Sequence, residues 1–223
     1  MKKLCAIMTT ILTVCILFTA CGSNTATTTA TSGSVTASTD SDKAEICMIL
    51  KTFNNAFWVK VKDGIKANAD KMGIKVDIVA ANSEDDVEGQ LNLLETAIQK
   101  GYKAIGISPI SPTNLNNAIA EANKRGIYVV NYDESIDIDS LDNIGGWIYA
   151  FVTTDNKKVG ESAAKYLMSQ LPNGGDVAII EGKAGVTSGE NRKEGAKTAF
   201  SSDSKFKLVA SQPADWDRTK ALD

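Results

Sequence analysis

The alternation of short apolar runs with amphipathic stretches is the feature that most restricts how this chain can fold. Beyond residue 43, apolar runs such as Ile46–Leu50 alternate with stretches whose apolar residues recur at helical spacing, as at Phe57, Val61 and Ile65. Strands with apolar residues on both faces are typical of parallel sheets covered by helices on both sides. The sequence therefore predicts an α/β fold with two doubly wound parallel-sheet lobes.

The same pattern sets the expected element boundaries. Strands are expected at residues 46–50, 75–80, 103–108, 127–132, 177–180 and 206–211. Helices are expected at residues 57–72, 87–98, 115–122, 155–171 and 189–200. We expect residues 44–153 to form a first lobe and residues 154–223 to form part of a second lobe.

The first 43 residues are predicted to lie outside the folded body. Residues 1–20 combine two lysines with the apolar run Leu4–Phe18, which is typical of a signal peptide. Cys21 follows small residues in a pattern that resembles the lipobox of bacterial lipoproteins, so we expect Cys21 to carry a lipid anchor. An ordinary secretory signal with a chance cysteine is the alternative. Residues 21–43, rich in Ser and Thr, are expected to be a disordered tether. The expected location is the cell envelope, at the outer face of the cytoplasmic membrane or in the periplasm.

Composition excludes several classes of function. The chain has no histidine, so a His-based catalytic triad or a His metal site is impossible. The net charge of −3 gives no basic face for nucleic acid. Beyond Cys21 only Cys47 remains, within an apolar run, which predicts a buried thiol and no intramolecular disulfide. We expect no enzymatic activity, no metal and no cofactor.

Polar and aromatic side chains follow the predicted strands at the edge where open α/β sheets bind ligands. Charged and amide groups suit the hydroxyls of a monosaccharide, and aromatic rings suit the C–H patches on the faces of its ring. The candidate ligand-binding residues are Lys51, Asn55, Phe57, Trp58, Asp133, Glu134, Arg192 and Trp216.

Several of these residues have alternative explanations. Phe57 could start the core face of its helix. Asn55 could serve only as a helix N-cap. Asp133 and Glu134 could be exposed loop acids, and Arg192 could belong to a solvated helix face.

Three runs carry a family resemblance: Asn55-Ala56-Phe57-Trp58, Thr154-Asp155-Asn156 and Ala214-Asp215-Trp216-Asp217-Arg218. With them, the chain from about Lys43 to Asp223 resembles the periplasmic sugar-binding proteins of the ribose/galactose type, the receptors of ABC importers. The resemblance implies a monomer that closes two lobes over a monosaccharide and delivers it to ABC permease subunits. A sensor that signals to a membrane kinase or chemoreceptor is the alternative function.

The resemblance also implies a role for each candidate. Phe57 and Trp58 would cover one side of the sugar ring and Trp216 the other. Asp133 and Arg192 would hold hydroxyls and the ring oxygen, and Asn55 would supply an amide. Lys51 and Glu134 would favour allose-like over ribose-like specificity. Such receptors continue well past the Ala-Asp-Trp-Asp-Arg run, so the second lobe is expected to be truncated and the chain to bind sugar more weakly than an extended product.

Overall fold

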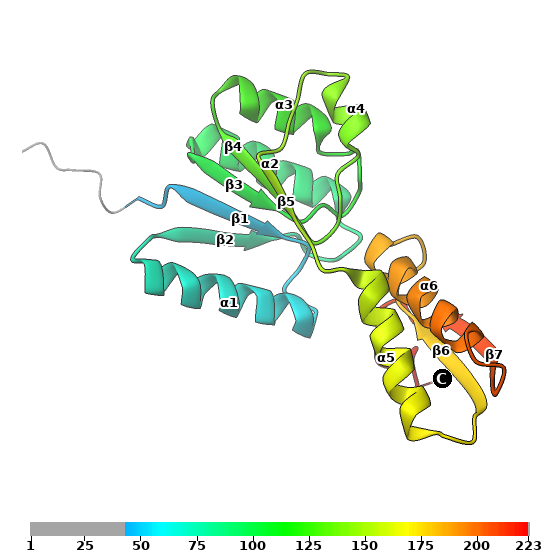
Figure 1. Ribbon diagram of the computed structural model, residues 1–223. Helices are drawn as coiled ribbons and strands as arrows, with labels where there is room; N and C mark the ends of the chain where they lie inside the picture. Colours follow the sequence, from blue (N-terminus) through cyan, green and yellow to red (C-terminus); the bar gives the residue numbers. More distant parts are fainter. Residues whose placement is uncertain (1–42, 223) are drawn as a thin grey trace, which may run out of the picture. The chain divides into compact units, whose positions relative to one another are not determined.

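The computed structural model describes residues 43–222, which belong to one unit, Asp40–Asp223. Its first sheet has five parallel strands in the order β2-β1-β3-β4-β5 (Figure 1). In the register of this sheet, Ile49 lies opposite both Val79 and Ile107. The strands are β1 (Ile46–Leu50), β2 (Val76–Ala80), β3 (Ala104–Ile107), β4 (Tyr128–Tyr132) and β5 (Ala150–Val152).

Helices cover both faces of the first sheet. One face packs against α2 (Val87–Lys100) and α3 (Asn116–Lys124), and α1 (Ala56–Met72) lies on the opposite side (Figure 1). The short α4 (Ile138–Asp142) precedes β5. The core between the sheet and α2 and α3 includes Ile49, Leu94, Ile105, Ile119 and Val129, all buried.

The second sheet pairs β6 (Gly175–Glu181) with β7 (Phe206–Pro213) in parallel. Two helices, α5 (Asn156–Gln170) and α6 (Thr187–Ser201), pack with it. A separate apolar cluster joins these elements: Ala164, Val177, Ala199, Phe200 and Phe206.

The predicted α/β class is confirmed, and the expected strands and helices are present within a few residues of their predicted bounds. The N-cap of α5 is Asp155, whose carboxylate accepts from the Lys158 N–H. The predicted lobe boundary at residues 153 and 154 lies between β5 and α5. The signal peptide, Cys21 and all of the tether except Lys43 fall outside the described residues.

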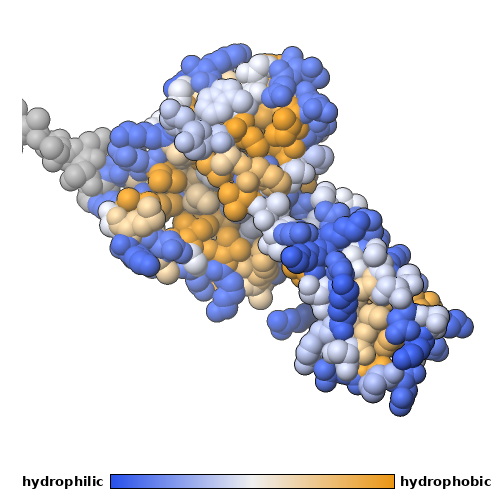
Figure 2. Space-filling model, viewed as in Figure 1, coloured by the Kyte–Doolittle hydropathy of each residue, from blue (hydrophilic) through white to orange (hydrophobic). Residues whose placement is uncertain are grey.

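Two features of the described surface and core complete the fold. Cys47 is a buried free thiol, and burial raises its pKa to about 11. Apolar residues are visible on the surface of the first sheet (Figure 2), and Tyr128, Tyr149 and Phe151 are among the exposed aromatic residues. Within residues 43–222, none of the helices has the length and apolar character needed to cross a bilayer.

Candidate sugar-binding site

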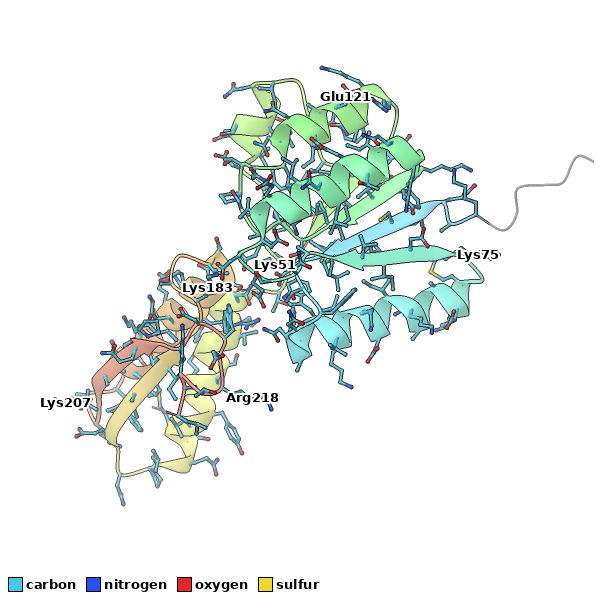
Figure 3. The ribbon with its side chains drawn as sticks, turned by 180° about the vertical axis from the view of Figure 1, so that it is seen from behind. Lys51, Lys75, Glu121, Lys183, Lys207 and Arg218 are labelled. Carbon is cyan, nitrogen blue, oxygen red and sulfur yellow. The ribbon has the colours of Figure 1, made fainter. Side chains whose placement is uncertain are left out.

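A cavity of about 180 Å³ lies where the carboxyl ends of the first-sheet strands meet α6 and the loop after β7. Lys51, directly beyond the end of β1, is one of its lining residues (Figure 3). The structure brings seven of the eight predicted ligand residues into the lining: Lys51, Asn55, Phe57, Trp58, Asp133, Arg192 and Trp216. The remaining lining residues are Glu84, Val186 and Ser188.

A charge pair between the buried Lys51 and the half-buried Asp133 forms one wall of the cavity. The Lys51 ammonium lies 3.7 Å from Asp133 Oδ2, and the Lys51 side chain is only 6% exposed. The Ser108 hydroxyl donates to the same Asp133 oxygen at 3.2 Å. Burial raises the pKa of Asp133 above its ordinary value, although the Lys51 charge acts to lower it. This wall offers a cation and a carboxylate that are already oriented toward each other.

The start of α1 supplies an aromatic wall whose geometry is fixed by hydrogen bonds. Asn55 is the N-cap of α1 and accepts from the Phe57 N–H at 2.9 Å. Its amide nitrogen donates to Glu84 Oε1 at 2.9 Å, and the Trp58 indole N–H donates to the same oxygen at 3.2 Å. Asn55 therefore acts as a helix cap and also lines the cavity.

The two adjacent rings have different exposures. Trp58 is 2% exposed, whereas Phe57 is 51% exposed, so the alternative that Phe57 starts the core face of its helix is wrong. The rings meet edge to face with centroids 5.0 Å apart, and the Lys51 ammonium lies 5.8 Å from the centroid of the Trp58 ring. Phe57 is thus free to contact a ligand, while Trp58 is held on several sides.

The Trp216 ring packs against two glycines. A Cβ added at Gly182 would come within 2.2 Å of the Trp216 ring, and one added at Gly189 within 3.1 Å. Asp215 and Trp216 both adopt positive φ angles, 53° and 62°, which few non-glycine residues do. The chain therefore accepts an unfavourable backbone conformation where it places the indole in the cavity.

Arg192 carries an unsatisfied polar atom at this site. Its guanidinium lies 6.0 Å from the centroid of the Trp216 ring. Within residues 43–222, its Nε is one of three buried side-chain nitrogen or oxygen atoms without a hydrogen-bond partner. Leaving a buried donor unpaired costs about 1–3 kcal/mol.

Glu134 is the one predicted ligand residue that does not line the cavity. It is buried, and its Oε1 accepts from the Ser188 N–H at 3.1 Å. The Asn131 amide nitrogen donates to the Glu134 carbonyl oxygen at 2.7 Å and fixes the backbone of this loop.

The candidate ligand-binding residues from the sequence did not include Glu84, Val186 or Ser188. Glu84 precedes the N-cap of α2 in the loop after β2, a strand end for which no candidate was proposed. Reading the end of β2 in the same way as the other strand ends would have found it. Val186 and Ser188 lie where α6 begins, and neither residue type signals ligand binding by itself.

The lining can bind a polar molecule with apolar faces. It offers the Lys51 and Arg192 cations, carboxylates at Asp133 and Glu84, and three aromatic rings. Within the described part of the chain, there is no group of three or more His, Cys, Asp or Glu side chains that could hold a metal ion.

Most of the chain matches a family that is already described. Residues 46–223 match the family described as Periplasmic binding protein domain. The chain is 53% identical over 181 residues to the D-allose-binding periplasmic protein of Escherichia coli (strain K12), an alignment that covers 81% of this chain and 58% of that protein. It is 36% identical over 177 residues to the ribose import binding protein of Bacillus subtilis (strain 168), covering 79% of this chain and 54% of that protein.

A solved structure is also similar to this chain. An ABC transporter periplasmic solute binding protein from Actinobacillus succinogenes 130z with bound D-allose superposes with a TM-score of 0.76 at 33% identity. The superposition covers 81% of this chain and 63% of that one. The chain therefore spans less than two thirds of the length of these three proteins.

Proposed function

Because the chain belongs to the Periplasmic binding protein domain family, we propose that it captures a monosaccharide of the D-allose type in the Lys51–Arg192–Trp216 cavity and delivers it to an ABC permease. The observation that carries this proposal is a cavity whose lining combines the Lys51–Asp133 pair, Arg192 and three aromatic rings. The similarity to D-allose-binding relatives supports the choice of sugar.

The chemistry of each wall suits a pyranose. The Asp133 carboxylate accepts hydrogen bonds from hydroxyls, and the Arg192 and Lys51 cations donate to hydroxyl or ring oxygens. Phe57 and Trp216 offer flat apolar area to the C–H faces of the ring. A ligand that lacks one matched hydroxyl would leave a group of this site unpaired at a cost of about 1–3 kcal/mol.

Saturation-transfer NMR on the full chain tests the proposal, because it detects weak as well as moderate binding. We expect D-allose to show saturation transfer and D-glucose, its epimer at one carbon, to show much less. Trp216→Ala should weaken D-allose binding roughly tenfold, since it removes one aromatic wall. Trp147 is 40% exposed against 38% for Trp216 and does not line the cavity, so Trp147→Ala is the matched control and should leave binding unchanged.

Absence of any signal from D-allose with the folded chain would refute the proposed function. Equal losses of D-allose affinity in Trp216→Ala and Trp147→Ala would also refute it.

We also propose that Cys21 is lipidated and holds the chain at the outer face of the cytoplasmic membrane. The support is the sequence pattern alone, an apolar run followed by small residues and a cysteine. Metabolic labelling with an alkyne fatty acid should mark the chain, and Cys21→Ser should abolish the label. Persistent labelling of Cys21→Ser would contradict this assignment.

A further inference from the structure

The amino end of α6 has no cap from its N-cap residue. Its N-cap is Val186, which has no side-chain acceptor, and α6 makes no side-chain cap hydrogen bond there. The first N–H groups of a helix need partners from elsewhere. One of them, the Ser188 N–H, donates to Glu134 Oε1 in a buried hydrogen bond of 3.1 Å.

Glu134 comes from the loop after β4, distant in sequence from α6. This loop is fixed by Asn131, which is fully buried in the first sheet. The Asn131 amide nitrogen donates to the Glu134 carbonyl oxygen, and its Oδ1 accepts from the Ile136 N–H at 3.0 Å. Glu134 itself is only 8% exposed, so its carboxylate has little freedom to turn elsewhere.

The electrostatics of this contact favour a carboxylate. The amino end of an α-helix carries a partial positive charge, and an ionised acceptor there makes a charge-assisted hydrogen bond. A carboxylate buried without such a partner would be costly. The Ser188 N–H therefore gives one oxygen of the buried Glu134 carboxylate a partner within the chain.

The Ser188 cap lies about one helical turn from Arg192. Ser188 and Arg192 are four residues apart in α6, so they lie on the same helix face, and both line the cavity. The body of α6 is pressed against α5, because a Cβ at Gly160 would meet the Arg192 carbonyl oxygen at 1.9 Å. The Glu134 contact adds a restraint at the amino end of α6.

We propose that Glu134 is a positioning residue, which caps α6 and thereby aims the Arg192 guanidinium into the cavity. In this role Glu134 supports the site without contacting the sugar directly. The cap stands on the geometry alone, whereas its effect on sugar affinity rests on the proposed function.

The first test needs no sugar. In the full ¹⁵N-labelled chain, Glu134→Ala should shift the Ser188 amide proton signal upfield and speed hydrogen exchange in the first turn of α6 roughly tenfold. Glu134→Gln keeps an acceptor oxygen and should have a smaller effect. Asp139→Ala, which removes an exposed acid from nearby α4, is the control and should leave Ser188 unchanged. An unmoved Ser188 signal in a folded Glu134→Ala chain would overturn the proposal.

The second test uses D-allose. Glu134→Ala should weaken binding roughly tenfold in the otherwise unaltered chain and have little effect in an Arg192→Met background, because the effect acts through Arg192. If Glu134→Ala lowers the affinity for D-allose roughly tenfold in both backgrounds, Glu134 contacts the sugar directly and the proposal is overturned. If the unaltered chain binds no D-allose, the proposed function fails, and the amide measurement still decides whether Glu134 caps α6.

Discussion

Asp133 combines a strained backbone with a half-buried carboxyl group. Its φ angle of 66° lies in the left-handed region, where Asp and Asn are tolerated better than other non-glycine residues. Burial raises the pKa of its carboxyl, and the nearby Glu134 charge raises it further against the opposing effect of Lys51. Asp133 therefore holds its proton to higher pH in the folded chain than in the unfolded chain.

This shift predicts a pH dependence of stability. The stabilisation from proton binding is fully present below the ordinary Asp133 pKa and is lost as pH rises through the raised value. Asp133→Asn keeps a residue that tolerates the positive φ angle and cannot ionise, so it should remove this decline. The measurement is the thermal midpoint of both chains across the acidic range. Parallel curves would show that Asp133 does not titrate with a raised pKa.

At the residue scale, the sequence predicted which residues lie near the cavity better than it predicted the direction of their side chains. Five predicted residues reach one cavity because they follow β1 and β4, whose carboxyl ends share one edge of the first sheet. The other two, Arg192 and Trp216, come from α6 and the loop after β7. The position of Glu134 next to Asp133 could not show that its carboxylate turns to a helix end. That orientation depends on the hydrogen bonds from the buried Asn131 side chain to the loop backbone. Such contacts have no sequence pattern.

Among the elements, α5 and α6 approach each other through two glycines. A Cβ at Gly160 would lie 1.9 Å from the Arg192 carbonyl oxygen, and a Cβ at Gly195 would lie 2.0 Å from the Lys157 carbonyl oxygen. Both obstacles are backbone atoms, which cannot turn aside as a side chain can. The spacing of this helix pair is therefore set by the absence of side chains at two positions.

Gly195→Ala should separate these helices and lower the free energy of unfolding by about 1–3 kcal/mol, as overpacking does in a core. Gly64→Ala in α1 is the matched control, because a Cβ there meets nothing within 4 Å. That change should stabilise the chain by up to about 1 kcal/mol, since alanine favours helix. Urea denaturation measures both values. Similar values for the two variants would contradict the close-packing argument.

The elements that the sequence analysis missed are the short ones. α4 has five residues and β5 has three, so neither is long enough to show a helical or strand period. β5 also differs from the predicted strands because Phe151 and Val152 are exposed. Its pairing with β4 decides its conformation, and that pairing is not visible in local sequence.

At the scale of the described molecule, the chain has two separate apolar cores of unequal size. Sixteen buried side chains form the cluster around the first sheet, whereas five form the cluster around β6 and β7. The second sheet also has only two strands. Less buried apolar area means a smaller free-energy cost for local opening of this region.

Hydrogen exchange followed by mass spectrometry should reveal this difference. We expect amides of β6 and β7 to exchange at least about tenfold faster than amides of β1 and β3 in the folded chain. Adding D-allose should reduce the difference in exchange rate between the two sheets if both regions contact the sugar. Equal protection of the two sheets without sugar would contradict the argument from core size.

The direction of β1 has a practical consequence. Ile46 begins this strand at the amino edge of the first sheet, and Leu50 ends it beside the cavity residue Lys51. Five strand residues span roughly 15 Å. A biosensor chip or fluorescent reporter coupled ahead of residue 43 would thus join the sheet at the edge opposite to the one that supplies the cavity, and analyte could still enter.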